Sequence, residues 1–262
     1  MLTSLRNLAR HRALVWALVQ RALRARYRGS FLGFVWSFLN PLLLLLVYTL
    51  VFRYVFAPRH GSGPEPYALF LFTGLLPWIW LSSSLMEASQ SIADGGALLK
   101  KIAFPAEVLP LVAVLANAVH FLLAAPVLLV FLAVWGPGLS PQALLAPLPM
   151  LVEFLYATGL GLGLAALGVR YRDVRDLLAN FLTLWFFASP VFYAIESLPE
   201  NIRRYVVLNP LGPILDAYHN TLFYGRAPAW IPLGVSALVG LALTLAGYAL
   251  FERFRESFAE EV

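Results

Sequence analysis

Five long stretches of this sequence carry no charged side chain, and this pattern limits the possible folds more than any other feature. The stretches are residues 31–52, 66–86, 108–152, 177–195 and 227–251. A helix needs about 20 predominantly apolar residues to cross the hydrocarbon core of a bilayer. The stretch 108–152 is twice that length and is interrupted at residues 136–141 (GPGLSP), so it predicts two helices joined by a turn. The sequence therefore predicts an all-α membrane protein with six transmembrane helices.

The composition agrees with this prediction and excludes several kinds of site. Only 13% of the 262 residues are charged, whereas soluble domains contain about 25%. The chain has no cysteine, which excludes disulfides and cysteine nucleophiles. Its only lysines, Lys100 and Lys101, do not follow a glycine-rich phosphate-binding loop. We therefore expect no nucleotide site, metal site, nucleic-acid partner or enzymatic activity in this chain.

Basic residues are distributed unevenly around the predicted helices. Seven of the 19 lie before residue 31, and six helices with a cytoplasmic N-terminus place 14 of them inside and 5 outside. Positive charge is enriched in the cytoplasmic loops of membrane proteins. The distribution predicts that both termini are cytoplasmic, together with the loops at residues 94–106 and 169–176.

The segment 13–28 has helical periodicity and two chemically different faces. One face carries Val15, Trp16, Val19, Leu23 and Tyr27, and the other carries Gln20, Arg21, Arg24 and Arg28. Arg26 falls on the apolar side, from which its long side chain can snorkel toward lipid headgroups. We expect residues 1–30 to contain a cytoplasmic amphipathic interface helix. A basic topology signal with no other role is the alternative.

Residues 196–226 do not resemble an ordinary loop. Pro199 before Glu200 predicts a helix start, and the pairs Asn209-Pro210 and Gly212-Pro213 break the chain before a second short helix at 214–224. Each piece is too short to cross a bilayer. We expect two re-entrant helices in the outer leaflet, or else a hairpin on the surface. The transmembrane domain then spans 31–251, and a charged cytoplasmic tail follows at 252–262.

Glycines recur in the predicted fourth helix, at Gly159, Gly161 and Gly163. They contain a small-xxx-small pattern, which lets helix backbones approach closely in a membrane. The string looks like a nucleotide-binding glycine motif, but it follows no predicted strand and lies in an apolar helix. We therefore predict a packing role.

Five motifs, in register along nearly the whole chain, resemble one known family. They are residues 27–36 (YRGSFLGFVW) with Leu39-Asn40-Pro41-Leu42 and Val47-Tyr48, residues 72–78 (FTGLLPW), residues 98–110 (LLKKIAFPAEVLP), Arg172-Asp173, and Leu208-Asn209-Pro210-Leu211. In these motifs the chain resembles the permease subunits of ABC-type polysaccharide exporters, which secrete O-antigen, capsule and teichoic acid chains.

The resemblance implies a homodimer of half-transporters in the bacterial inner membrane, bound to two copies of a separate ABC ATPase. That ATPase would hold ATP and Mg²⁺, and this chain would hold no cofactor. The implied substrate is a polysaccharide on a polyprenyl diphosphate lipid, moved out of the cytoplasm. An exporter of drugs or small lipids would share the six-helix plan. A polyprenyl-lipid enzyme is disfavoured because the cytoplasmic acids are interleaved with arginine and have no His nearby; a proton-driven transporter is disfavoured because no internal repeat is found.

Aromatic residues are the candidates for a substrate path under this resemblance. Their flat apolar faces, with a polar atom in Trp and Tyr, suit a sliding sugar chain. Aromatic residues also gather at both interfaces of any membrane protein, so this reading has a plain alternative. The candidates are Trp36, Phe38, Tyr48, Phe72, Trp78, Trp80, Phe181, Trp185, Phe186 and Tyr193.

Two further sets of residues are candidates for contacts at the cytoplasmic side. Arginine suits bidentate phosphate recognition, so the lipid diphosphate, or lipid headgroups in general, would meet Arg24, Arg26, Tyr27, Arg28, Leu32 and Gly33. The ATPase would contact the two cytoplasmic loops through Lys100, Lys101, Phe104, Pro105, Glu107, Arg170, Arg172, Asp173, Arg175 and Asp176. A topology signal alone would explain the basic residues of these loops but not the acids beside them.

Three ionisable residues fall near or within the predicted helices, namely Glu87, His120 and Glu153. Intramembrane ionisable residues are functional candidates because their burial is costly. Glu153 is the most interior of them, and it could pair with a helix terminus or face the sugar path.

Overall fold

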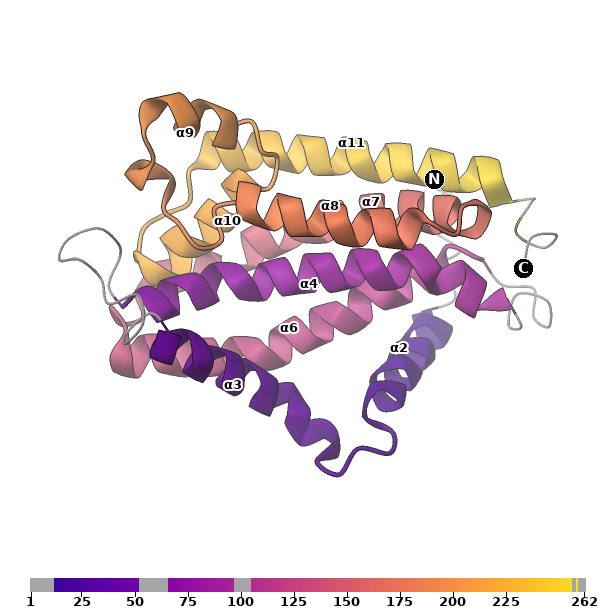
Figure 1. Cartoon of the computed structure of the whole chain (residues 1–262), viewed down its shortest axis with the longest axis horizontal. Helices are drawn as coiled ribbons and strands as arrows, with labels where there is room; N and C mark the ends of the chain where they lie inside the picture. Colours follow the sequence, from indigo (N-terminus) through magenta and orange to yellow (C-terminus); the bar gives the residue numbers. More distant parts are fainter. Residues whose placement is uncertain (1–11, 52–65, 97–104, 256–257, 259–262) are drawn as a thin grey trace.

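The computed structural model describes residues 12–51, 66–96, 105–255 and 258. Within these ranges the chain forms nine α-helices and no strand, which confirms the all-α prediction (Figure 1). The helices are α2 (Arg12–Tyr27), α3 (Trp36–Leu50), α4 (Tyr67–Asp94), α6 (Val108–Trp135), α7 (Pro147–Arg170), α8 (Val174–Ala188), α9 (Glu200–Val206), α10 (Gly212–Tyr218) and α11 (Trp230–Phe254). Short helical turns lie at η1 (Gly33–Val35), η3 (Pro141–Leu145), η4 (Ile195–Ser197) and η5 (His219–Phe223).

Four helical segments among the described residues are long and apolar enough to cross a membrane. They are α4, α6, the continuous segment Pro141–Arg170 and α11, with 25 to 30 residues each. Helices α3 and α8 have 15 residues each, or about 22 Å at 1.5 Å per residue, against a hydrocarbon core of about 30 Å. The structure therefore gives four candidate spans, and the count of six remains a prediction.

The helices run between two ends of one bundle (Figure 1). One end contains α2, the last turns of α4, α7 and α11, and the first turns of α6 and α8. The other end contains the turn between α6 and α7, together with α9 and α10. The described parts of the loops predicted to be cytoplasmic thus lie at the same end as α2. Which side of the membrane this end faces remains a prediction.

Helices α7 and α11 pack so closely that their backbones touch. A Cβ atom on Gly247 would lie 2.0 Å from the carbonyl oxygen of Gly159, and one on Gly159 would lie 2.5 Å from the backbone of Leu243 and Thr244. The Thr244 hydroxyl also donates a hydrogen bond of 3.0 Å to the carbonyl of Leu155. These contacts confirm the packing role predicted for the glycines of this helix.

Helix α2 packs one side against α6. Val19 is fully buried there with Val108, Val112 and Ala116, as its place on the apolar face predicts. Trp16 was expected on this face, but 56% of its surface is exposed. It sits one residue after Val15, about 100° around the helix, which carries it off the side that α6 covers.

The chain turns sharply between α2 and α3. Gly29 and Gly33 have φ angles of +80° and +51°, values that favour glycine. The sequence places the start of the first membrane helix at Phe31, but Phe31 is fully exposed within this turn, between Gly29 and Gly33, and α3 begins at Trp36. The correction follows from Gly33, whose left-handed conformation cannot continue a right-handed helix.

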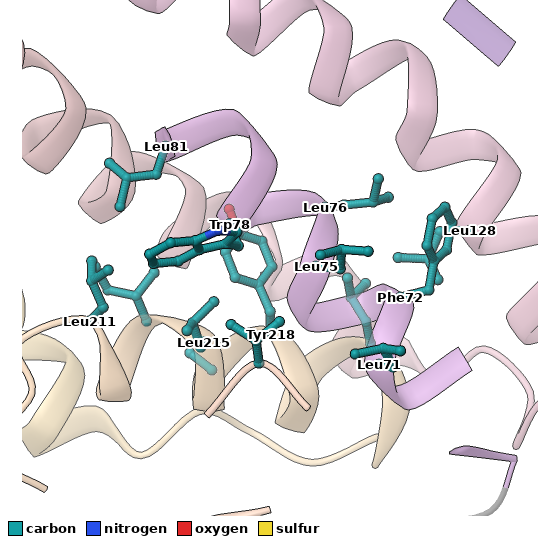
Figure 2. Packing of buried hydrophobic residues seen from close by; sticks show 14 of the residues in the cluster. Leu71, Phe72, Leu75, Leu76, Trp78, Leu81, Leu128, Leu211, Leu215 and Tyr218 are labelled. Atoms are coloured by element: carbon teal, nitrogen blue, oxygen red, sulfur yellow. The ribbon is translucent and has the colours of Figure 1, made fainter. Parts of the chain in front are cut away.

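The segment 196–226 divides into two unlike halves. Helix α9 begins at Glu200 after Pro199, as predicted, and is mostly exposed. Helix α10 begins at Gly212, two residues before the predicted start, and continues through η5 to Phe223. Its residues are buried in the main core, where Leu215 and Tyr218 lie beside the α4 residues Leu75 and Trp78 (Figure 2). The second half is therefore not a hairpin lying on the surface.

Candidate functional site

A groove of about 590 Å³ lies between α8 and the chain around α9. Its lining is mostly apolar and aromatic: Phe181, Trp185, Phe187, Ala188, Tyr193, Leu198, Ile202, Tyr205, Val206, Leu208, Asn209 and Pro210. The prediction included Phe181, Trp185 and Tyr193. It missed Tyr205, which lies on a helix too short to show a clear apolar face in the sequence.

Asn209 fixes the geometry of this aromatic groove. Its side-chain oxygen accepts a hydrogen bond of 3.0 Å from Nε1 of Trp185, and its amide nitrogen donates to the carbonyl of Ala188 at 3.0 Å and the hydroxyl of Ser189 at 2.9 Å. The sequence predicted the Asn-Pro pair as a chain break and as part of a family motif. The structure gives the asparagine a second role, because it orients the indole and ties the end of α8 to the start of α10.

The predicted path residues do not share one surface. Trp78 packs edge-on against Trp185, with ring centroids 6.0 Å apart, and contacts Phe186. Phe38 and Tyr48 are half-buried on α3. Phe72 and Trp80 are buried inside the helix packing, where the Trp80 indole donates to the carbonyl of Val114 at 3.3 Å. Phe72 is thus enclosed by neighbouring helices, whereas Trp80, although almost fully buried, also lines the cavity described next.

A second cavity, of about 420 Å³, lies between α3 and the pair α4 and α6, next to the end of α2. Its lining combines polar, aromatic and aliphatic side chains: Arg26, Ser30, Trp36, Ser37, Asn40, Pro41, Leu44, Leu76, Ile79, Trp80, Ser83, Asn117, His120, Phe121 and Ala124. Three of the predicted site residues thus line one cavity, although Arg26 was assigned to the lipid diphosphate or headgroups and Trp36 and Trp80 to the substrate path.

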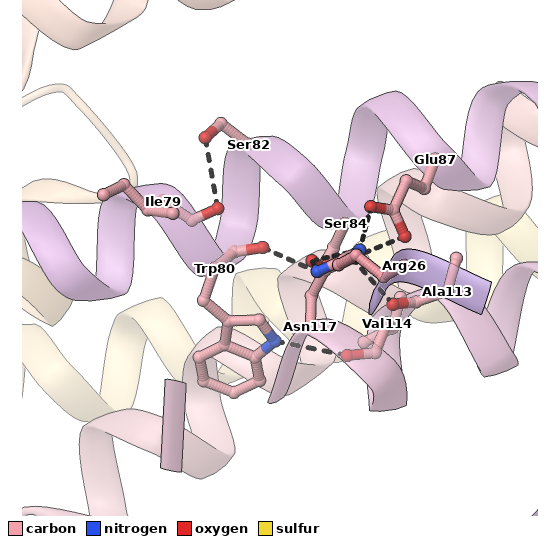
Figure 3. Close-up of polar contacts among 9 residues, drawn as sticks. All are labelled: Arg26, Ile79, Trp80, Ser82, Ser84, Glu87, Ala113, Val114 and Asn117. Carbon is pink, nitrogen blue, oxygen red and sulfur yellow. Dashed lines mark hydrogen bonds and ion pairs between the residues drawn. The ribbon is translucent and has the colours of Figure 1, made fainter. Parts of the chain in front are cut away.

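Arg26 joins three helices at the edge of this second cavity. Its guanidinium forms an ion pair with Glu87 of α4 and donates to the Asn117 side-chain oxygen of α6 at 3.3 Å (Figure 3). The amide nitrogen of Asn117 in turn donates to Glu87 Oε2 at 3.0 Å. The sequence predicts that Arg26 snorkels to headgroups; in the structure an acid of α4 and an amide of α6 bind its guanidinium, and the side chain remains 35% exposed.

The other predicted headgroup residues lie around the same turn. Arg24 and Arg28 are exposed, and Arg24 is 3.5 Å from the oxygen of Gln20 on its own helix. Leu32 is half-buried, and Gly33 adopts a positive φ. The side chain of Tyr27 lies outside the described part of the chain.

The turn between α7 and α8 is the described part of the predicted ATPase contact. Arg170, Arg172, Asp173, Arg175 and Asp176 are all exposed at one end of the bundle. Asp173 immediately precedes the first residue of α8, and its carbonyl accepts from the amide of Leu177 at 3.0 Å. This turn presents mixed charges on a short, helix-anchored loop.

The other predicted contact loop is described only at its end. Pro105 and Glu107 are buried rather than exposed, so neither offers a surface for docking in this structure. Lys100, Lys101 and Phe104 lie outside the described residues.

Buried polar groups hold α10 and η5 inside the bundle. The Tyr218 hydroxyl donates to Glu153 Oε2 at 2.8 Å, and Glu153 is 2% exposed. Nε2 of His219 lies 3.1 Å from the carbonyl oxygen of Phe70, and the Ser236 hydroxyl donates to the carbonyl of Pro210 at 3.0 Å. The partner of Glu153 is therefore a side-chain hydroxyl on α10, not the helix terminus that the sequence offered as one alternative. The intramembrane position of Glu153 was the signal for this cluster, but nothing in the sequence indicated Tyr218.

The described geometry, a helical bundle with a short charged turn at one end and an aromatic groove toward the other, agrees with a membrane transporter subunit. The model of the ABC-2 type transporter membrane family matches residues 13–223. The chain belongs to this family.

Known proteins are similar to the chain along its whole length. The chain is 39% identical over 264 residues to the O-antigen export system permease protein RfbA of Myxococcus xanthus, with 100% of both chains covered. It is 30% identical to a protein of the same name from Klebsiella pneumoniae, over 94% of each chain. It is 24% identical to the polysialic acid transport protein KpsM of Escherichia coli, over 93% of this chain and 94% of the other.

Proposed function

We propose that this chain is the membrane subunit of an ATP-driven exporter that moves a polysaccharide on a polyprenyl diphosphate lipid across the bacterial inner membrane. The observation that carries the proposal is the full-length similarity to proteins named for O-antigen and polysialic acid transport, including 39% identity over the whole chain. The lipid carrier is the part of the proposal that comes from the resemblance of the sequence motifs.

The proposed assembly contains two copies of this chain and two copies of an ABC ATPase that binds ATP and Mg²⁺. Each copy would cross the membrane six times, with both termini in the cytoplasm. The course of α3 and α8 alongside the longer helices supports six crossings (Figure 1). The outer face of α8 supports a second copy, since Leu177, Phe181, Leu184 and Phe187 are all exposed on it, and apolar faces pack against other helices or lipid in a membrane.

The aromatic groove is the proposed place where the polysaccharide slides past this chain. Phe181, Trp185 and Tyr193 offer ring faces to the apolar faces of sugars, and Tyr and Trp add polar atoms. A groove rather than a closed pocket suits a polymer, because successive sugars must bind weakly enough to leave. The groove is open on one side in a single chain, so a second copy would complete the path.

The turn at residues 170–176 is the proposed contact with the ATPase. A short loop fixed between two helices transmits a rigid-body movement to both of them. The exposed mixture of Arg172, Asp173 and Arg175 suits a salt-bridged contact with a partner surface. Such a contact would convert closure of the ATPase on nucleotide into movement of α7 and α8.

Export in cells tests this proposal. Deleting the chain should stop long-chain polysaccharide from reaching the cell surface, and the lipid-linked polymer should accumulate inside. Reversing both charges, with Arg172→Glu and Asp173→Arg, should reduce export at least tenfold while the protein still inserts in the membrane. Arg226→Glu, at the opposite end of the chain's bundle, is the control and should leave export unchanged. Unchanged export in the deletion strain, or ATP hydrolysis by the purified chain alone, would refute the proposal.

A further inference from the structure

The second cavity has a gradient of polarity that three helices share. Along α3 the lining changes from Ser37 to Leu44, and along α6 it changes from Asn117 to Ala124. Along α4, which runs in the opposite direction, it changes from Ser83 to Leu76. Each change takes seven residues, or about 10 Å of helix. Arg26 and Ser30, at the end of α2 and just after it, belong to the polar end, whereas Leu44 of the apolar end lies further along α3, away from the turn that follows α2.

The charged side chain in the lining of the polar end is basic. Among the described residues that line the cavity, Arg26 is the only Lys or Arg, and none is Asp or Glu. Ser30, Ser83 and Asn117 line the same cavity, and the amide nitrogen of Asn117 already donates to Glu87 and to the carbonyl of Ala113. A guanidinium with neighbouring hydroxyls and amides is a set of donors suited to phosphate oxygens. The shape and the charge together fit an amphiphile with a phosphate-bearing head and an apolar chain.

Glu87 binds the Arg26 guanidinium but does not itself belong to the residues that line the cavity. It pairs with Arg26 and is braced by Asn117, yet the side chains of Arg26 and Glu87 are 35% and 42% exposed. The pair is therefore within reach of an incoming anion. A carboxylate that already holds the guanidinium competes with any phosphate for the same N–H groups.

We propose that the second cavity binds the phosphate-bearing head and first apolar segment of a lipid, and that the lipid's anion displaces Glu87 from Arg26. This displacement would break the ion pair that joins α2 to α4. Binding of the lipid would therefore change how α2, the predicted interface helix, is held. The lipid phosphate could belong to the polyprenyl diphosphate of the substrate, which rests on the proposed function, or to a membrane phospholipid. The site itself stands on the cavity and on the Arg26–Glu87–Asn117 contacts.

Lipid binding to the full-length chain in complex with its ATPase tests the site. The delipidated complex is titrated with undecaprenyl diphosphate in one arm and with phosphatidylglycerol in the other, and bound lipid is counted by native mass spectrometry. Arg26→Gln should weaken binding by about tenfold or more, the loss of a charged hydrogen-bonded contact. Glu87→Gln should strengthen binding several-fold, because the competing charge is gone. Ser83→Phe keeps the charges but fills the cavity, and it should weaken binding.

The opposite signs of the two charge variants separate this mechanism from a packing role. If Arg26→Gln and Glu87→Gln weaken binding alike, or if neither changes it, the competition is refuted. Arg21→Gln, on the exposed face of α2, is the control, and an effect as large as that of Arg26→Gln would assign the binding to unspecific headgroup attraction. Melting temperatures of all variants exclude misfolding as the cause of a loss.

The two lipids distinguish the sources of the phosphate. Tighter binding of undecaprenyl diphosphate with the expected variant pattern supports a substrate site. Tighter binding of phosphatidylglycerol with the same pattern supports a phospholipid site and refutes the substrate as its occupant. Failure of the polysaccharide export proposal would appear instead in the deletion strain, independently of either titration.

Discussion

Helices α7 and α8 are separated by a turn of three residues, but they meet the rest of the molecule in opposite ways. Helix α7 is enclosed, since its glycines bring it to the backbone of α11 and Gly168 would place a Cβ atom 1.9 Å from the carbonyl of Ser89 on α4. Helix α8 buries only Leu178 and Leu182 and exposes much of the rest of its surface. Helix α7 therefore belongs to a packed core that one chain completes by itself. Helix α8 presents an apolar face that lipid, substrate or a second copy must cover.

The close packing of α7 against α11 predicts the largest loss of stability. Gly159→Leu places a side chain where the backbone of α11 already lies, so the two helices must separate. We expect a loss of about 3 kcal/mol or more in the free energy of unfolding, seen as a large drop in melting temperature or as loss of folded protein. Gly234→Leu on α11 has open space around its Cβ and should be tolerated. Equal melting temperatures of the two variants would contradict the close packing of α7 against α11.

The buried pair Glu153–Tyr218 predicts a smaller effect on the same enclosed side. Tyr218→Phe removes the hydroxyl that donates to Glu153 and leaves a buried carboxyl group without this partner. An unsatisfied buried polar group costs about 1–3 kcal/mol, which thermal unfolding in detergent measures. The matched change Tyr205→Phe on exposed α9 should alter stability by less than about 0.5 kcal/mol. A tolerated Tyr218→Phe would show that this bond does not hold α10 in place.

The exposed face of α8 predicts the smallest effect on stability and a clear effect on transport. Phe181→Ala removes a ring that protrudes into the aromatic groove, so we expect a loss below about 1 kcal/mol together with slower export of long chains. The next residue provides the comparison, because Leu182 is buried and Leu182→Ala should cost about 2–5 kcal/mol. Export and melting temperature are measured for both. A large loss of stability in Phe181→Ala would assign the ring to packing rather than to a path.

The order and limits of the helices follow largely from local sequence. The proline and glycine residues at 136–141 and the break at Asn209-Pro210 end helices because of their own backbone constraints. The pattern of Gly159 and Gly163 predicts a close contact between two helices, because only small residues let helix backbones approach each other. The seven basic residues before residue 31 and the five family motifs are equally visible in the sequence. These features required no knowledge of which helices are neighbours.

The tertiary structure alone decided the partners. Arg26 meets Glu87 and Asn117 across 61 and 91 residues of sequence, and periodicity cannot reveal such a meeting. Phe72 and Trp80 are buried while Phe181 is exposed, although all three are aromatic residues in apolar stretches. The physical reason is that lipid is as apolar as a protein core. Hydrophobicity therefore places a side chain within the membrane, but only packing determines whether it faces lipid, a helix or a path.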